Sequence, residues 1–204
     1  MSLKLYGTFG TCSLAVHIAL REAGLPFDFV MVDLQTRKTS DDRDLTALNE
    51  KGYVPVLELE DGQTLTEVPA VLQYIADLAP EKGLAPPTGT MARYRLQEWL
   101  SFINSELHKA FGPLFNPMSS EEAKAQSCAK VMERLTWVDR QLGQHTFLLG
   151  GEFTVADAYL FVAAGWTKFV GIDISELKRL GVYCGQVAGR PAVQEALRAE
   201  GLIT

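Results

Sequence analysis

Apolar positions near the start of the chain change between strand-like and helical spacing. Residues 3–6 form a short apolar strand, residues 12–23 carry apolar side chains at helical spacing, and residues 27–34 are rich in Phe and Val. Gly24 ends the predicted helix, because glycine readily adopts the left-handed conformation of a helix cap. A strand, a helix and a second strand in this order predict a βαβ unit with parallel strands and a right-handed crossover.

A second group of elements follows the polar residues 35–44, which are typical of a loop with some helix. Alternating apolar and polar positions in residues 54–67 predict a β-hairpin, with an Asp-Gly pair at positions 61 and 62 as its turn. Residues 68–78 have helical spacing, and Pro69 stands in the first turn, where a missing N–H group costs little. The predicted order is therefore βαβ followed by ββα.

Strand signals disappear after a stretch rich in Pro and Gly at residues 80–90, which we interpret as a linker. Helical spacing predicts four helices beyond it. The helix at 154–170 is apolar on nearly all sides, so it should lie in the centre of the core. The sequence thus predicts an α/β domain at 1–79 and an all-α domain at 91–204. The four predicted helices span residues 91–115, 119–144, 154–170 and 190–201.

Composition narrows the class of protein. The 204 residues are 47% hydrophobic and 22% charged, with a formal net charge of −6. An acidic balance argues against a nucleic-acid or anionic-membrane partner, since both require clustered Lys and Arg. No apolar run approaches the ~20 residues that span a bilayer, and no signal peptide is visible. We therefore expect a cytoplasmic protein.

Cys12 is the first candidate for chemistry, because it stands where a glycine-flanked loop becomes a helix. N–H groups and the dipole at a helix N-terminus favour a thiolate and nearby anions. The thiol could equally be a small packed side chain. A redox pair is less favoured, since Ala15 stands where a CxxC motif needs cysteine. Cys128 and Cys184 are expected to be packing residues, and the three cysteines predict neither a disulfide framework nor a zinc site.

Two further motifs have both structural and functional interpretations. Pro55 is a strand start or a rigid turn, and Val54 before it would keep backbone groups available for an extended, peptide-like ligand. Glu67 is a common type of helix cap, but it could also hold an ammonium group. In that case the N–H of Val68 would bind the carboxylate beside it.

Small and polar residues share one face of the helix at 91–115, with Ser101, Ser105, His108 and Gly112 spaced by four, three and four. This face suits a helix that lines a cleft, although a single histidine is more often an ordinary surface or core residue. Thr154 and Asp157 together form a capping box, which is a structural feature.

The motifs GTCSLAVHIALREAGLPF, KGYVPVLELEDGQTLTE, AVLQYIADLAP, SELHKAFGPLFNP, FTVADAYLF and ALRAEGLI resemble those of bacterial glutathione S-transferases of the beta class. They cover the whole length in the family's order. The resemblance implies a thioredoxin-like N-terminal domain followed by a helical C-terminal domain, which is the glutathione transferase fold. It also implies a homodimer, glutathione as co-substrate between the domains, and no other cofactor or metal.

The resemblance also implies roles for individual residues. Cys12 matches the family cysteine near the glutathione sulfur, and His108 lies near the thiol as a second catalytic residue. The remaining glutathione-binding matches are Arg37, Val54, a usually cis Pro55, Glu67, Val68, Ser101, Ser105 and Lys109. We expect the pocket for a small hydrophobic electrophile to be lined by Phe9, Phe111, Phe115 and Trp166.

Three departures from the family pattern are expected to affect the affinity for glutathione and the range of second substrates. Val68 replaces a small residue or Ser, Ser101 replaces a frequent Asn, and Phe9 replaces a common Pro. The main prediction is conjugation of the glutathione thiolate to an electrophile. The alternatives are a thiol–disulfide oxidoreductase or dehalogenase that uses Cys12, and a binding protein without catalysis.

Overall fold

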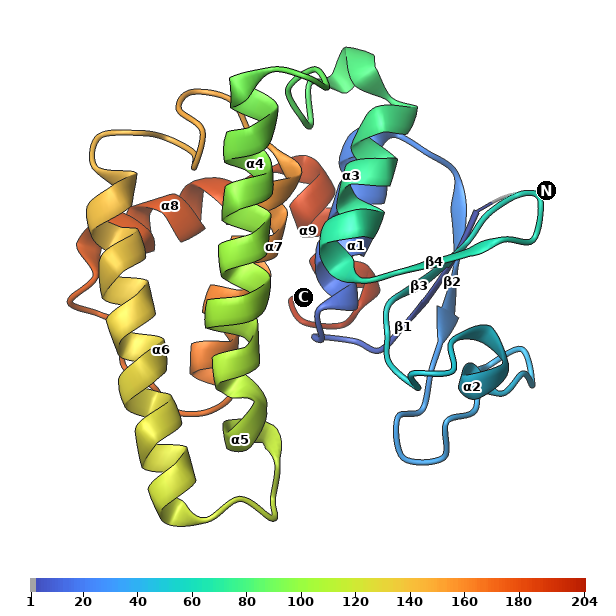
Figure 1. The fold of residues 1–204 in the computed structure, drawn as a ribbon, viewed down its shortest axis with the longest axis horizontal. Helices are drawn as coiled ribbons and strands as arrows, with labels where there is room; N and C mark the ends of the chain where they lie inside the picture. The colour runs from blue at the N-terminus through green and yellow to red at the C-terminus, as the bar shows by residue number, and fades with distance from the viewer. Residues whose placement is uncertain (1–2) are drawn as a thin grey trace. The chain divides into compact units, whose positions relative to one another are not determined.

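The structure is a computed structural model that describes residues 3–204 (Figure 1). Contacts between residues divide the chain into two compact units. Unit 1 comprises the N-terminal part up to Ala85 together with Arg190–Thr204, and unit 2 comprises Pro86–Gly189. Each unit has its own buried core, and we describe them one at a time.

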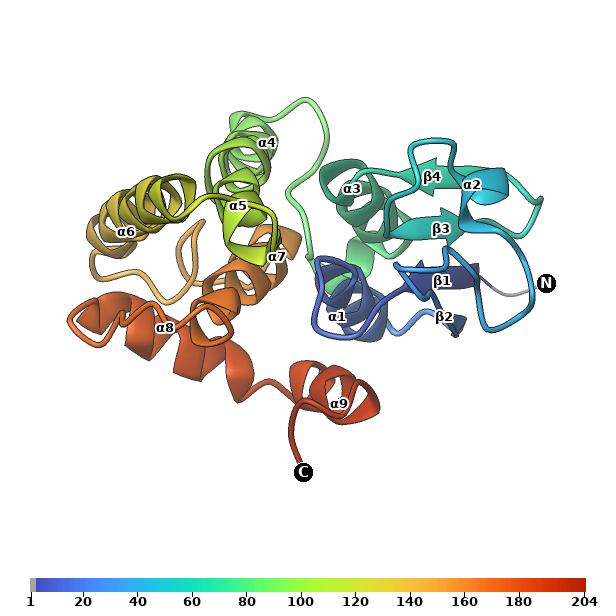
Figure 2. The same cartoon turned by 90° about the horizontal axis from the view of Figure 1, so that it is seen from below.

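Among the described residues, unit 1 is built on a four-stranded sheet with the order β2-β1-β3-β4 (Figure 2). β1 runs parallel to β2, and β3 runs antiparallel to both β1 and β4. In the strand register, Leu5 of β1 is paired with Phe29 of β2 on one side and with Leu57 of β3 on the other. The predicted order of βαβ followed by ββα is confirmed. The strands are Leu3–Gly7 (β1), Phe27–Met31 (β2), Val56–Glu58 (β3) and Thr64–Thr66 (β4).

The helices α1 (Ser13–Ala23) and α3 (Val68–Leu78) pack against each other on the same side of the sheet (Figure 2). α1 is buried along most of its length because it also packs against α9 (Pro191–Ala199). Gly24 ends α1 in the left-handed conformation, as the sequence predicted. The polar loop after β2 leads to the short helix α2 (Leu45–Leu48).

The unit to which α9 belongs differs from the one predicted from the sequence. Residues 190–204 were predicted to belong to a helical domain of 91–204, whereas they pack within unit 1. The physical reason is that α9 is amphipathic. Its apolar residues Val193 and Ala196 are fully buried, and the helix packs on α1 of unit 1. The packing thus assigns α9 to unit 1, and the division into functional domains stays a prediction.

Unit 2 is helical, and α7 forms its core as predicted. Nearly every residue of α7 is buried, and the helix packs against α4, α8 and the segment after α4. Across residues 3–204, no helix is long and apolar enough to cross a membrane. The helices of unit 2 are Met91–Phe102 (α4), Gly112–Phe115 (α5), Glu121–Leu142 (α6), Val155–Gly165 (α7) and Lys178–Ala188 (α8).

Two features of unit 2 were not predicted. The helix expected at 91–115 is interrupted, because a π-helical segment at Ile103–His108 follows α4 and a 3₁₀ turn precedes α5. The helix α8 was also not predicted from the sequence. Leu180, Tyr183 and Val187 follow helical spacing and are buried in α8, but glycine at 181 and 185 lowers the helix propensity of the segment.

Cys184 on α8 should remain a protonated thiol near neutral pH. Burial raises the pKa of this thiol to about 11, compared with about 8.5 for a free cysteine. The folded state therefore holds the proton more tightly, and this group should lower the free energy of unfolding as pH rises from about 8.5 to 11. At pH 8, iodoacetamide should alkylate Cys184 roughly 100-fold more slowly in the folded protein than in urea. Equal rates by peptide mass spectrometry would contradict this prediction.

Candidate functional site

Cys12 lies at the N-terminus of α1 and is 8% exposed. Its Sγ donates a hydrogen bond to the backbone oxygen of Val54 at 3.4 Å. The peptide bond between Val54 and Pro55 is cis. Unit 1 thus brings the thiol together with the strand-entry residue and the proline that the sequence analysis selected.

The loop before Cys12 is held by close local contacts. Ser13 Oγ accepts a hydrogen bond from the Thr8 N–H at 3.1 Å, and a Cβ on Gly7 would lie only 2.6 Å from that oxygen. Gly10 has a φ of 72°, and its N–H donates to the Glu200 carboxylate at 2.8 Å. A residue near the C-terminus of the chain therefore anchors the loop that leads to Cys12.

Glu200 belongs to a buried hydrogen-bond chain in unit 1. Its Oε1 lies 2.8 Å from His17 Nδ1, and the side chains of His17 and Glu200 are 2% and 0% exposed. Arg21 Nε donates to His17 Nε2 at 2.9 Å, so the proton on Nδ1 is the one that His17 donates to Glu200. Arg21 also pairs with Glu195 at 3.1 Å. The chain connects α1, α9 and the Cys12 loop.

Replacing Glu200 with alanine should lower the free energy of unfolding by about 2–5 kcal/mol, because the buried His17 would lose the carboxylate to which its ring N–H donates, and the hydrogen bond from the Gly10 N–H to Glu200 would be lost as well. Urea unfolding of the variant measures this loss. Glu195→Ala is the matched control on α9, since its carboxylate is 61% exposed and should contribute about 0–1 kcal/mol. Equal stability of the two variants would contradict the anchoring role of Glu200.

Glu67 and Val68 lie where β4 leads into α3. Glu67 has a φ of 69°, and the buried Val68 is the first residue of α3, so its N–H precedes the first intrahelical hydrogen bonds, which the Ala70 and Val71 N–H groups donate to the Glu67 backbone oxygen. The Glu67 carboxylate pairs with Lys51 Nζ at 2.6 Å, and Lys51 also donates to Thr66 Oγ1 at 2.9 Å. Both charged groups are about half exposed. Such a pair contributes about 0–1 kcal/mol, so Glu67 can exchange Lys51 for another ammonium group.

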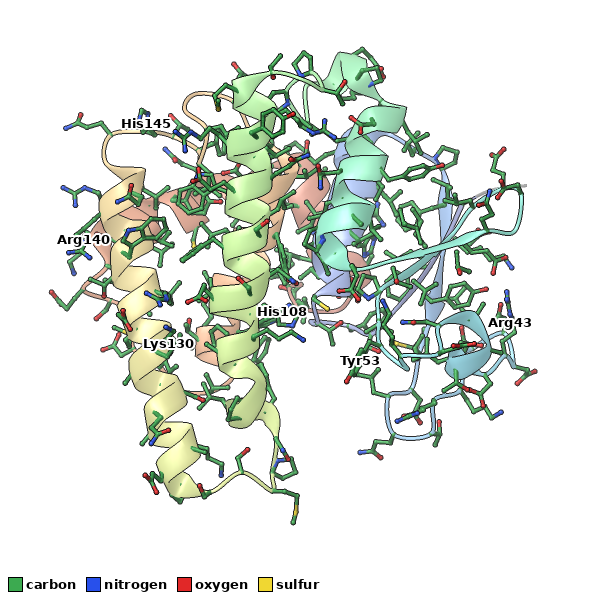
Figure 3. All side chains as sticks on the ribbon, viewed as in Figure 1. Arg43, Tyr53, His108, Lys130, Arg140 and His145 are labelled. Carbon is green, nitrogen blue, oxygen red and sulfur yellow. The ribbon has the colours of Figure 1, made fainter. Side chains whose placement is uncertain are left out.

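Arg37 lies in the loop between β2 and α2 and has a φ of 59°. Its backbone oxygen accepts from the Leu45 N–H at 2.9 Å. The guanidinium lies against Gly52, where a Cβ would come within 3.2 Å of its nitrogen. Arg43, labelled in Figure 3, ties the same loop to the sheet by donating to the Tyr6 hydroxyl at 2.8 Å. The loop that carries Arg37 is therefore anchored at both of these points.

In unit 2, His108 extends from the π-helical segment that follows α4 (Figure 3). Its Nδ1 lies 2.6 Å from the hydroxyl of Tyr159 in α7, and that hydroxyl donates to Asn104 Oδ1 at 3.0 Å. The ring of Trp166 lies edge-on at 4.7 Å between centroids. The imidazole is thus oriented by groups from two different elements.

Three of the four residues predicted for the electrophile pocket lie together in unit 2. The ring of Trp166 is 5.5 Å from that of Phe111 and 6.0 Å from that of Phe115. Phe9 belongs to unit 1, where its ring lies 5.4 Å from Phe29 and lines a cavity of ≈ 600 Å³. A pocket that Phe9 shares with the other three stays a prediction.

The remaining predicted residues of unit 2 lie at its surface. Ser101, Ser105 and Lys109 are exposed, and Ser105 Oγ donates to the backbone oxygen of Ser101 at 2.9 Å. Their contact with a ligand stays a prediction. Within residues 3–204, no group of three or more His, Cys, Asp or Glu side chains could hold a metal ion.

Sequence reasoning missed several residues that complete these sites. Tyr159 carried a usable signal, because a buried tyrosine hydroxyl in an apolar helix normally requires a hydrogen-bond partner. Lys51, Asn104 and Glu200 carried no comparable local signal. Their partners lie on other elements, and only the fold brings them together.

Comparison with known proteins decides the family. The sequence profile described as "Glutathione S-transferase, N-terminal domain" matches residues 9–78, and that described as "Glutathione S-transferase, C-terminal domain" matches residues 121–199. The glutathione S-transferase GstA of Escherichia coli O157:H7 is 42% identical over 200 residues, which cover 98% of this chain and 100% of the relative. The chain belongs to the glutathione S-transferase family.

Two solved structures of glutathione S-transferases narrow the class. The beta-class enzyme of Sphingomonas chungbukensis is 53% identical with a TM-score of 0.96, over 98% of this chain and 100% of that one. A sphingomonad glutathione S-transferase in complex with glutathione is 51% identical with a TM-score of 0.95, over 98% and 100% of the two chains. The predicted beta-class resemblance and the predicted transferase fold are confirmed.

Proposed function

We propose that this family member conjugates the thiolate of glutathione to small hydrophobic electrophiles. The observation that carries the proposal is the contact of Cys12 with Val54 beside the cis Pro55, in the same unit as the exposed Glu67. A thiol, the backbone groups of a residue just before a strand, and a carboxylate together suit a thiol-containing tripeptide with a free ammonium group.

Unit 1 supplies the contacts to the peptide part of glutathione in this proposal. The backbone of Val54 pairs with the backbone of glutathione. Glu67 exchanges Lys51 for the γ-glutamyl ammonium, and the Val68 N–H at the start of α3 receives the carboxylate beside it. Arg37 binds the glycine carboxylate. Valine at position 68 removes a side-chain hydroxyl contact but leaves the backbone donor.

The remaining residues serve the glutathione thiol and the electrophile. Cys12 and His108 act at the sulfur, where N–H donors at the start of α1 favour the thiolate. The aromatic cluster of unit 2 binds the electrophile together with Phe9. Ser101, Ser105 and Lys109 complete the set of glutathione-binding residues.

Calorimetric titration with glutathione, followed by turnover of an aryl halide, tests the proposal. We expect saturable binding and glutathione-dependent release of halide. Glu67→Gln should weaken binding by about 10-fold, since a neutral amide replaces the partner of an ammonium group. Its matched control is Glu176→Gln, which removes a carboxylate that is 91% exposed. Binding without turnover would favour the non-catalytic alternative, and absence of binding would overturn the proposal.

Thiol–disulfide exchange is a second candidate, because the Cys12 thiol itself lies at the helix N-terminus and within reach of a ligand paired with Val54. In this reaction Cys12 forms a mixed disulfide with one glutathione, and a second glutathione resolves it. Dehalogenation with Cys12 as nucleophile belongs to the same alternative.

We further propose that the protein acts as a homodimer in the cytoplasm, where it serves in detoxification. Large apolar side chains exposed on each unit support a partner surface: Tyr53 is 66% exposed in unit 1, and Met91 and Tyr94 are 70% and 56% exposed in unit 2. Light scattering should give twice the chain mass. A monomeric mass would contradict the dimer.

A further inference from the structure

Unit 1 contains a cavity of ≈ 600 Å³, and none of the described residues that line it was predicted to bind glutathione. The cavity lies where β2, α1 and α9 meet, since Phe29 is on β2, Arg21 is on α1 and Glu195 is on α9. β2 is the edge strand farthest from β4, and Figure 2 shows α9 and α3 on opposite sides of α1. The cavity and the junction of β4 and α3, where Glu67 and Val68 lie, are therefore at opposite edges of the sheet.

Four rings form one wall of this cavity. The centroid of the His17 ring lies 5.3 Å from that of Phe27 and 5.3 Å from that of Phe29. The Phe29 ring lies 5.4 Å from the ring of Phe9, which is 43% exposed. Phe27 and Phe29 are half-buried and share one face of β2, because side chains two residues apart in a strand point to the same side. The wall thus offers ring surface to a planar aromatic ligand.

Arg21 brings an oriented positive charge to this wall. Its Cζ lies 6.0 Å from the centroid of the Phe27 ring, and its Nε donates to His17 Nε2 at 2.9 Å. Because the guanidinium is planar, this hydrogen bond fixes the direction of Nη1 and Nη2. Nη1 donates to Glu195 at 3.1 Å, whereas Nη2 has no hydrogen-bond partner among residues 3–204.

Glu195 is a weak competitor for the Arg21 guanidinium. The side chains of Glu195 and Arg21 are 61% and 28% exposed, and an exposed ion pair contributes little because water screens both charges. A ligand carboxylate that binds both Nη1 and Nη2 forms two parallel charge-assisted hydrogen bonds, compared with the single bond to Glu195. The other nearby carboxylate, Glu200, is buried against His17 and does not line the cavity.

We propose that this cavity is a second small-molecule site, which binds a planar aromatic carboxylate with its ring against the phenylalanine wall and its carboxylate on Nη1 and Nη2 of Arg21. The volume lies within the range of about 300–1,000 Å³ that is typical of such sites. Leu25, Pro26 and Ala199 add further apolar lining. Apolar and aromatic walls with one oriented polar group are the usual composition of a small-molecule site.

Calorimetric titration with 2-naphthoate tests the site. We expect saturable binding that is at least about 10-fold tighter than that of the neutral 2-naphthalenemethanol, because the alcohol carries no charge for Arg21. Arg21→Gln should weaken the binding of naphthoate by about 10-fold and leave that of the alcohol unchanged. Arg198→Gln is the matched control on α9, since it removes an exposed guanidinium that does not line the cavity. It should change the affinity less than about 2-fold.

Two further variants cover the case that Arg21→Gln fails to fold. Glu195→Gln removes the carboxylate that competes for Nη1 and repels the ligand, so naphthoate should bind about 2- to 5-fold tighter. Phe27→Leu keeps an apolar side chain but removes a ring from the wall. It should weaken the binding of both naphthoate and the alcohol by about 2- to 10-fold.

NMR of the three histidines locates the bound naphthoate. His17 belongs to the cavity wall in unit 1, whereas His108 contacts Trp166 of the predicted electrophile pocket in unit 2. The ring current of naphthoate should shift the ring signals of His17 and leave those of His108 and His145 unchanged. Replacing His108, and separately His145, with glutamine assigns the signals.

Absence of saturable binding would overturn the proposal, as would equal affinities for naphthoate and the alcohol. Unchanged naphthoate binding in folded Arg21→Gln, weaker binding in Glu195→Gln, or shifts confined to His108 would also contradict it. Glutathione takes part in none of these titrations, so failure of the proposed function would leave their results unchanged.

Discussion

Cys12→Ala should abolish glutathione-dependent thiol–disulfide exchange and leave conjugation measurable. In exchange the sulfur of Cys12 forms the mixed disulfide, so its loss removes the nucleophile, and we expect a decrease of at least about 100-fold. In conjugation the reacting sulfur belongs to glutathione. The first-turn N–H groups of α1 and α3, together with His108, remain in the variant, and we expect a loss of no more than about 10-fold.

The two activities should be measured side by side, with reduction of a mixed disulfide as the exchange assay and an aryl halide as the electrophile. Cys184→Ala is a matched control, because it also removes a thiol but lies on α8. Persistent exchange in Cys12→Ala would show that Cys12 is not the nucleophile. Complete loss of conjugation would instead show that Cys12 is essential for conjugation, and the two assays therefore decide between the proposed function and its main alternative.

Asp157→Ala should cause the largest loss of stability among the variants considered. The side chain is 0% exposed and accepts four hydrogen bonds, which come from the backbone of Leu148, from the backbone and hydroxyl of Thr154, and from the hydroxyl of Tyr183. Burial raises the pKa of this carboxyl, and the four donors oppose the rise. Alanine would remove this acceptor from the two backbone N–H groups and the Thr154 hydroxyl, whereas the Tyr183 hydroxyl would keep the backbone oxygen of residue 157 at 3.2 Å.

Unsatisfied buried donors cost about 1–3 kcal/mol each and are not fully additive, so we expect Asp157→Ala to lose about 3–5 kcal/mol. In a protein of this size that loss corresponds to a decrease in Tm of roughly 10 °C. Thermal and urea unfolding measure both quantities. Glu176→Ala in the same unit is the control, since its carboxylate is 91% exposed and should contribute less than about 1 kcal/mol. A Tm for Asp157→Ala within 2 °C of the control, roughly the effect of 1 kcal/mol, would contradict the proposed importance of the buried acceptor.

Local sequence signals were sufficient to predict most helices and strands of this protein. Gly24 ends α1 in the structure as it did in the sequence pattern, because a left-handed cap depends on one residue and its neighbours. The start of α3 at Val68 and the capping interaction between Asp157 and Thr154 were also predicted, because each depends on residues that are close together in the chain. α8 was missed because its two glycines lower the helix propensity that local reasoning relies on, and the helix forms through burial of its apolar face.

The candidate site was predictable only in part. Cys12, Pro55, Glu67 and His108 were selected from the sequence, because reactive residue types stood at loop ends and helix starts. Their partners were not selected. The Cys12 loop is anchored by Glu200 from 190 positions away, and His108 is oriented by Tyr159 from 51 positions away.

The sequence by itself determined the order of the elements, the buried character of α7, the family and the residue types available for chemistry. These properties follow from periodicity and from motifs whose residues lie close together in the chain. Only the tertiary structure decided that α9 packs on α1, that the helix after Phe102 becomes π-helical, and that the Tyr159 hydroxyl lies against Nδ1 of His108. Those outcomes depend on satisfying buried polar groups and apolar faces between distant segments, and no local pattern contains that information.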